Sequence, residues 1–550
     1  MRDLKVKESA NPKSGNGKTE TQINKLFGRM TSFLMAVYVL FYLCVFPLSL
    51  HNKYFDILTF RFRLFWKPTL AYGIIFLILG LLYLAADALY NKGDIRKSFF
   101  AGLKNKGWKN YISSTDVAMT AVIIVFSLST ALAEYPYEAF WGNRGRCHGL
   151  LMWLMLYIAY ILITRFYKFK KWHIYAFMAF ASAVCIWGIC NFFLITFGMF
   201  DGADEQYKYI FVSSIGNINN YSNFTGIIYG VAAAMFVLSE SKLETIYTYL
   251  ILVIASFAQI MGLSTSVILS TGIVIAATPV LLWKRFTHVV KYFTVVVTYL
   301  MSLKITSLVT KSGISTMNDP DPSVQITMAG TKMFMILIAV ALLLLVISFV
   351  YAFKKKESQD EIKSINKLIN AWKILLIAVV AIMVVVLILA NIGWHPEIWS
   401  PYEHFLIFGD DWGTGRGLIW RLGMDYWIND STLLAKIIGY GPDTYYIITM
   451  DRFMNLMQDA GYGMFDSAHN EYFEYFITTG ILGLTAYVSL LVTSIRAMIK
   501  SEAAGVKGAM LGVIAYATQA VVNIAIPITT PVFFVLMFAG TKGAKEKSRD

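Results

Sequence analysis

Apolar runs, most of them about 20 residues long, recur along almost the whole chain and are separated by mostly short polar stretches. This is the length that an α-helix needs to cross the hydrocarbon core of a bilayer. Because backbone groups in lipid must be satisfied inside the segment itself, such runs predict helices rather than open sheets. The runs lie at 31–50, 67–90, 116–133, 148–164, 174–198, 224–238, 244–262, 265–283, 290–309, 332–353, 374–392, 472–494, 505–523 and 528–541.

The composition agrees with a chain embedded in a membrane. Of its 550 residues, 57% are hydrophobic and only 15% are charged, whereas soluble domains carry about 25% charged residues. A soluble fold could not cover so much apolar surface, but lipid can remain in contact with it. We therefore predict an all-α fold, a polytopic transmembrane bundle of about 12–14 helices.

The basic residues predict the orientation of the chain. The net charge is +14, with 48 Lys and Arg against 34 Asp and Glu. If the N-terminus lies inside and the spans alternate, 34 of the 48 basic residues fall in cytoplasmic segments. Cytoplasmic loops carry such an excess, so the charge indicates topology and requires no nucleic-acid partner. We expect a multi-pass protein of the cytoplasmic membrane with both termini cytoplasmic.

The polar stretch between the predicted spans at 374–392 and 472–494 is much longer than the others. It is rich in Trp, Tyr, Gly and Asp, and it falls on the outer face in this orientation. Since long loops are uncommon unless they are functional, we expect short helices and a catalytic role here. The predicted parts are a basic cytoplasmic N-terminus, N-terminal transmembrane helices, an extracytoplasmic catalytic loop, C-terminal transmembrane helices and a cytoplasmic tail, at 1–30, 31–392, 393–471, 472–541 and 542–550.

Two arginines, Arg144 and Arg146, lie in the predicted outer segment before the span at 148–164. Their position runs against the charge bias of outer segments. A guanidinium group matches phosphate oxygens with two parallel hydrogen bonds, so one interpretation is a pyrophosphate clamp. The alternative is that these side chains reach the lipid interface or pair with Glu134 or Glu138.

Two further outer segments combine glycine with polar side chains. Asn219 ends a Gly-Asn-Ile-Asn run, where an amide could bind sugar hydroxyls or cap the following helix. Arg416 stands in a Gly-Thr-Gly-Arg-Gly run, where glycines allow the backbone to approach a ligand closely, and Arg421 follows it. These arginines could reach a second phosphate, or they could be solvated charges on surface turns.

A histidine stands just before the predicted span at 472–494, in the run Asp466-Ser-Ala-His469-Asn470-Glu471. His469 could act as a general base near neutral pH, and an acidic neighbour could orient it. A histidine at the start of a helix is also common as a cap or as a solvated side chain.

Taken together in chain order, these segments resemble the O-antigen ligase/polymerase family. The resemblance rests on Gly415-Arg416 with Trp420, Gly439-Tyr-Gly441, and His469-Asn470 followed by Gly480-Ile-Leu-Gly483. The outer segment with Arg144 and Arg146, the Gly-Asn-Ile-Asn run and Asn523 extend it over most of residues 115–540. One departure is Ser264-Thr-Ser266, where such families often carry Ser-Arg.

The resemblance implies a glycosyltransferase that takes a glycan from a polyprenyl-pyrophosphate carrier at the outer leaflet. The acceptor would be a glycan, a lipid or a protein, and neither a cofactor nor a metal ion is implied. Arg416 and Arg146 would stabilise the departing pyrophosphate, His469 would act at the acceptor hydroxyl, and Asn219 would position the substrate. The remaining expected substrate-binding residues are Arg144, Arg421 and Asn470.

A transporter of a small anion or of a lipid-linked sugar is the main alternative. Transporters place ionisable residues near the middle of the membrane, whereas Asp87 is among the few charged residues in the predicted spans and lies close to a helix end. The polar residues of interest gather at the predicted outer face, which favours an interfacial enzyme. Both a ligase and a polymerase satisfy these observations.

Overall fold

The computed structural model describes residues 22–107, 111–143, 145–202, 204–314, 316–317, 323–354, 359–461 and 465–546. Within these ranges the chain is almost entirely helical, and its strands β1 (Phe211–Val212) and β2 (Gly216–Asn217) form one short antiparallel pair. The predicted all-α fold is confirmed. Arg144, residues 1–21 of the predicted N-terminal segment and residues 547–550 of the predicted tail lie outside the described residues.

Every predicted span coincides with a helix. In the described part of the chain, 10 helices are long and apolar enough to cross a membrane. They are α1 (Gln22–Leu40), continued to Leu48, α2 (Ile57–Tyr90), α4 (Ser114–Ala131), α7 (Lys171–Phe192), α9 (Lys242–Met261), α11 (Phe286–Lys311), α13 (Lys332–Lys354), α14 (Gln359–Asn391), α20 (Glu471–Ile499) and α21 (Ala504–Gln519). Two shorter apolar helices are α6 (Leu150–Phe166) and α10 (Val267–Leu282).

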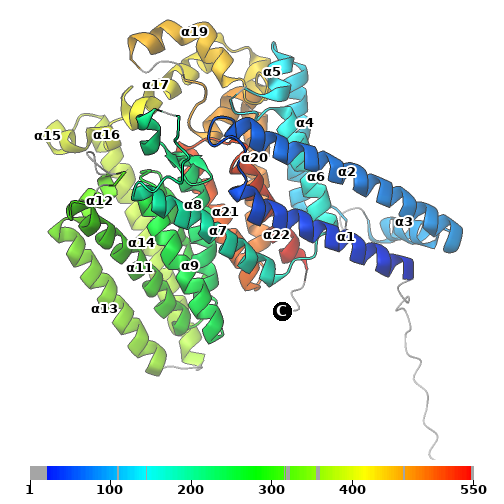
Figure 1. The fold of residues 1–550 in the computed structure, drawn as a ribbon, viewed down its shortest axis with the longest axis horizontal. Helices are drawn as coiled ribbons and strands as arrows, with labels where there is room; N and C mark the ends of the chain where they lie inside the picture. Colours follow the sequence, from blue (N-terminus) through cyan, green and yellow to red (C-terminus); the bar gives the residue numbers. More distant parts are fainter. Residues whose placement is uncertain are drawn as a thin grey trace, which may run out of the picture.

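The centre of the bundle is formed by α8 (Ile218–Val237), α21 and α22 (Thr530–Lys545), which other helices surround (Figure 1). Because α8 and α22 contact protein rather than lipid, they tolerate polar residues that a lipid-facing span would not. Glycines let α8 and α21 approach closely, since a Cβ at Gly230 would lie 2.7 Å from Leu511 O. Small residues serve this purpose at helix contacts in membranes.

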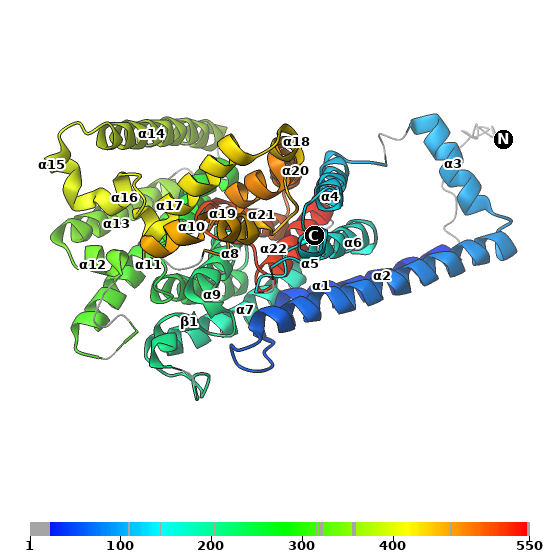
Figure 2. The ribbon, with the colours of Figure 1, turned by 90° about the horizontal axis from the view of Figure 1, so that it is seen from above.

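The periphery has the opposite character. Seen from above, α14 lies at one edge of the bundle, while α2 and α3 (Asp94–Lys106) extend away from it at another (Figure 2). Only 11% of the apolar window of α2 and 6% of that of α14 are buried inside the protein. These faces carry Leu, Ile and Val, so lipid is the environment that satisfies them.

Contacts between connecting segments agree with spans that alternate in direction. Tyr54 Oη donates to Ser213 O at 2.6 Å and joins two segments that are predicted on the outer side. At the other end of the bundle, Lys545 Nζ donates to Ser113 Oγ at 2.9 Å and joins two segments that are predicted on the inner side. Segments predicted on the same side thus pack together, as alternating spans require.

The long loop, residues 392–470 between α14 and α20, folds into short helices across one end of the bundle (Figure 1). Two further short helices, α5 (Pro136–Trp141) and α12 (Val324–Ala329), lie in other connections. The helices of the long loop are α15 (Pro396–Trp399), α16 (Glu403–Leu406), α17 (Trp412–Asp425), α18 (Leu433–Ile438) and α19 (Tyr445–Asp459).

A kink in α20 attaches the long loop to the bundle. Gly480 has φ 68° and interrupts the helical hydrogen bonding. Thr478 O instead accepts the N–H groups of Tyr440 at 2.8 Å and Gly441 at 2.9 Å. Ser129 Oγ of α4 accepts the same Gly441 N–H at 2.9 Å, so the loop is held by two helices at once.

Candidate functional site

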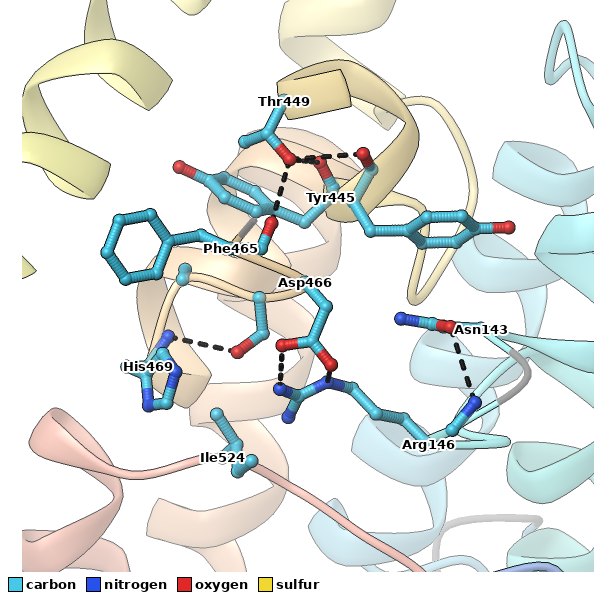
Figure 3. A network of polar contacts seen from close by, with 12 residues as sticks. Asn143, Arg146, Tyr445, Thr449, Phe465, Asp466, His469 and Ile524 are labelled. Atoms are coloured by element: carbon cyan, nitrogen blue, oxygen red, sulfur yellow. Dashed lines mark hydrogen bonds and ion pairs between the residues drawn. The ribbon is translucent and has the colours of Figure 1, made fainter. Parts of the chain in front are cut away.

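Four segments that are far apart in the sequence meet where the long loop covers the bundle. They are the connection from α5 to α6, the start of α17, the segment leading into α20, and the connection from α21 to α22, at residues 142–149, 410–421, 465–471 and 520–529. Figure 3 shows three of these segments around Asp466 and His469. The predicted residues Arg146, Arg416 and His469 are close enough that both guanidinium charges act on the imidazole.

Arg146 forms an ion pair with Asp466. Its Nε donates to Asp466 Oδ2 at 3.1 Å and its Nη2 donates to Oδ1, which gives two parallel bonds (Figure 3). Burial alone would raise the pKa of Asp466, but the charge and hydrogen bonds of Arg146 outweigh burial and lower that pKa. The predicted pyrophosphate clamp therefore already holds a carboxylate, and that partner is Asp466 rather than Glu134 or Glu138.

Asp443 lies beside this pair, and the sequence analysis did not single it out. One of its carboxylate oxygens accepts the backbone N–H groups of Asn143 at 2.8 Å and His148 at 2.9 Å. Burial raises the pKa of Asp443 to about 7, against the effect of those N–H groups and of Arg146. One signal in the sequence is Gly142, because a Cβ there would lie 2.5 Å from the same carboxylate oxygen.

His469 is set between cations in a buried position. Burial lowers the pKa of His469 to about 4, and the charges of Arg146 and Arg416 act in the same direction. The imidazole is therefore neutral at physiological pH and has a lone pair available. In the described part of the chain, its ring nitrogens have no hydrogen-bond partner, and its backbone N–H donates to Ser467 Oγ at 3.4 Å.

Asn470, rather than His469, caps α20. Asn470 Oδ1 accepts the N–H groups of Tyr472 and Phe473, both at 3.1 Å, so this side-chain oxygen satisfies the helix start. Trp420 Nε1 donates to Ala468 O at 2.8 Å and joins α17 to the same segment. These three bonds fix the backbone on both sides of His469.

Arg416 is the least neutralised of the predicted arginines that the structure describes. Its guanidinium donates to two carbonyl groups, Gly413 O at 2.5 Å and Val522 O at 3.3 Å. Its Nε is buried without a hydrogen-bond partner, and no described carboxylate pairs with it. Burial lowers the pKa of Arg416. The turn before it requires positive φ at Gly413, Thr414 and Gly415, which explains the glycines of this run.

Arg421 and Asn219 have other partners. Arg421 is exposed and binds Asp410 through two hydrogen bonds, both of 2.8 Å. Asn219 lies at the start of α8, where its Oδ1 accepts from Ser264 Oγ at 2.7 Å and its backbone oxygen accepts from Asn523 Nδ2 at 3.0 Å. The structure thus places Asn219 in contacts between helices, next to the connection that Arg416 touches.

The connection from α21 to α22 is the other part of the site that the sequence analysis missed. Val522 contacts Arg416, and Ile524 lies beside Arg146 (Figure 3). Of this connection, the sequence drew attention only to Asn523, whereas the contacts to Arg416 are made by a backbone carbonyl. Backbone contacts leave no mark on residue types, so no pattern could have revealed them.

Residues 322–488 match the model of a known family, described as O-antigen ligase. The match includes Arg416, Asp443, Asp466 and His469, whereas Arg146 and Asn219 lie outside it. No curated protein matches the chain. The match covers the long loop and the helices on either side of it, and within residues 322–488 it confirms the resemblance to the O-antigen ligase family that the sequence predicts.

Proposed function

We propose that this protein transfers a glycan from a polyprenyl-pyrophosphate carrier to an acceptor hydroxyl at the outer face of the cytoplasmic membrane. The family match supports a membrane glycosyltransferase of the ligase or polymerase type. The apolar helices support a membrane location. The donor, the face of the membrane and independence of metal ions are parts of the proposal.

The observation that carries the proposal is the pairing of a neutral base with an arginine that lacks a carboxylate partner. Among the described residues, the neutral His469 has no hydrogen-bond partner at its ring nitrogens, and Arg416 has a buried Nε without a partner and no counter-ion. A pyrophosphate oxygen would satisfy that guanidinium, since it accepts bidentate bonds. A fixed cation in a water-poor site stabilises the charge that develops on a leaving group.

The reaction that this arrangement supports is a single displacement. The acceptor oxygen forms a bond to the anomeric carbon, while the bond from that carbon to the phosphate oxygen breaks. The electron pair leaves with the polyprenyl pyrophosphate, near Arg416, and the hydroxyl proton passes to a ring nitrogen of His469. Attack from the side opposite the leaving group inverts the anomeric centre.

Arg146 has a different part in this scheme from the one that the sequence suggested. Its two bonds to Asp466 fix the guanidinium and leave it partly neutralised. We assign it the role of a positioning residue, which holds the segment that leads to His469 and keeps the imidazole neutral.

The first test compares Arg416→Ala, Arg416→Lys and His469→Ala in purified protein, with release of the lipid pyrophosphate as the readout. Loss of a charge-stabilising donor or of a base lowers turnover by about 10²-fold or more. Lysine should also be poor, because an ammonium group lacks the planar fork of arginine. Arg452→Ala, an exposed arginine of α19, is the matched control and should retain activity.

Product length separates the two activities. A ladder of longer lipid-linked chains indicates a polymerase, and one glycan block on an added acceptor indicates a ligase. Full activity of the His469 variant would remove that residue from the mechanism. Binding of the lipid-linked donor without any bond change in the wild type would instead support the transporter.

A further inference from the structure

We propose that a cavity beside the Arg146–Asp466 pair binds the carbohydrate part of the glycan acceptor. This inference rests on the proposed function, because an acceptor site has meaning only in a glycan-transferring enzyme. The cavity has a volume of about 650 Å³ and lies between α5, α19 and the segment that leads into α20. Its volume is in the range of pockets that bind small ligands, about 300–1,000 Å³.

The aromatic part of the lining supports this ligand class. Tyr137 and Trp141 come from α5, and Tyr446 comes from α19. Tyr137 is 71% exposed and Trp141 is 39% exposed, so a ligand can reach both rings. Sugar rings present faces of C–H groups that pack on aromatic faces, and aromatic side chains lose little conformational entropy on binding.

The polar part of the lining consists of acceptors and an amide. Glu138, Asn143 and Asp466 line the same cavity, and Figure 3 shows the Asn143 amide on the side of Asp466 away from His469. Carboxylates accept hydrogen bonds from hydroxyl groups, and an amide both donates and accepts. Aromatic faces interleaved with such groups match a neutral sugar better than an apolar or an anionic ligand.

The position of the cavity distinguishes an acceptor from a donor. The donor pyrophosphate carries negative charge, which Glu138 and Asp466 would repel, whereas Arg416 attracts it. Asp466 forms part of the cavity wall and stands three residues before His469. A hydroxyl group that extends past Asp466 would reach the base, while the donor sugar stays attached to the pyrophosphate near Arg416.

The test measures acceptor and donor kinetics in Trp141→Ala and Tyr446→Ala. The acceptor KM should rise about tenfold in each, because the aromatic face on which the sugar packs is removed, while kcat and the donor KM stay within about twofold of wild type. Trp141→Phe should restore most of the acceptor affinity. Tyr402→Ala, which removes an exposed aromatic side chain of the long loop outside the cavity, is the matched control.

Direct binding provides a readout that needs no turnover. The probe is the free oligosaccharide that mild acid releases from the lipid-linked donor, observed by saturation-transfer NMR on the detergent-solubilised protein. Signals in the wild type that weaken in both cavity variants support the proposal. An unchanged acceptor KM, or a rise in the donor KM alone, overturns it even when the wild type is active. A wild type that never turns over contradicts the proposed function, and the NMR result then decides whether the cavity binds sugar.

Discussion

His469 is held neutral by burial and by two neighbouring cations. A neutral imidazole can accept a proton, but a pKa of about 4 makes it a weak base in the free protein. A bound pyrophosphate would neutralise part of the charge of Arg416 and so raise the basicity of His469. The base would therefore become stronger when the donor is present, which limits side reactions of an empty site.

The pH dependence of kcat/KM tests the lowered pKa of His469, because kcat/KM reports the pKa values of groups in the free enzyme. Activity requires the neutral imidazole, so it should persist well below pH 6.5 and fall as the pH drops through about 4. The measurement is carrier release at low substrate concentration from about pH 3 to about pH 8. A loss of activity near pH 6.5 would show either that the pKa of His469 is not lowered or that His469 is not the base.

Asp443 makes stability depend on pH in the opposite sense to an ordinary surface carboxylate. Its pKa is about 7 in the folded protein and about 3.9 in an unfolded chain. The folded state therefore holds the proton more tightly, so this contribution to stability is complete below about pH 4 and is lost as the pH rises through 7. Asp443→Asn should flatten the dependence of the unfolding temperature on pH between 4 and 8, and an unchanged slope would contradict this.

Among the elements, α20 carries the most informative irregularity. Gly480 has φ 68° and ψ −176°, a region that is essentially restricted to glycine. The kink turns Thr478 O out of the helix so that it accepts two N–H groups of the long loop. A regular helix would use that carbonyl internally, and the loop would lose its attachment.

Gly480→Ala should therefore destabilise the protein by about 1–3 kcal/mol from backbone strain alone, and more because a Cβ would overlap the backbone of Ile437 and Ile438. Thermal unfolding in detergent measures the loss. Gly80→Ala is the matched control, since it lies in α2 with nothing within 4 Å of its Cβ. Equal stability of the two variants would argue against the role of the kink.

The elements themselves could be predicted from hydropathy, and the site only in part. Apolar runs located each membrane helix, because lipid imposes one length and one polarity on a span. Residue types located Arg416 and His469. The partner of Arg146 is 320 residues away in sequence, and the contacts of Val522 and Asn470 depend on backbone geometry. Such long-range pairings follow from packing, which a single sequence does not encode in a readable pattern.

At the scale of the whole molecule, the long loop covers one end of the bundle (Figure 1), and most Lys and Arg fall in the segments that are predicted on the opposite side. Connections that are predicted on the same side contact each other, through Tyr54 and Ser213 on one side and through Ser113 and Lys545 on the other. The long loop belongs to the first side, opposite to Ser113 and Lys545. The distribution of Lys and Arg then predicts that the loop is outside.

Cysteine labelling of a variant without native cysteines tests this orientation in intact cells. Asn429→Cys in the long loop should react with a membrane-impermeant maleimide, and Lys363→Cys at the start of α14 should react only after lysis, since both positions are exposed. The reverse pattern would overturn the orientation and would place the site on the cytoplasmic face.

The connection from α21 to α22 lies beside both arginines of the site, because Val522 O accepts a hydrogen bond from Arg416 and Ile524 lines the same small cavity as Arg146. A few residues of uncharged backbone thus set the distance between the two guanidinium groups. This stretch therefore spaces the cation that would hold the leaving group from the cation that positions His469. Inserting one residue between Val522 and Ile524 would shift Arg416 relative to Arg146 without removing either arginine, and would change how far the leaving group held by Arg416 lies from the base that Arg146 positions.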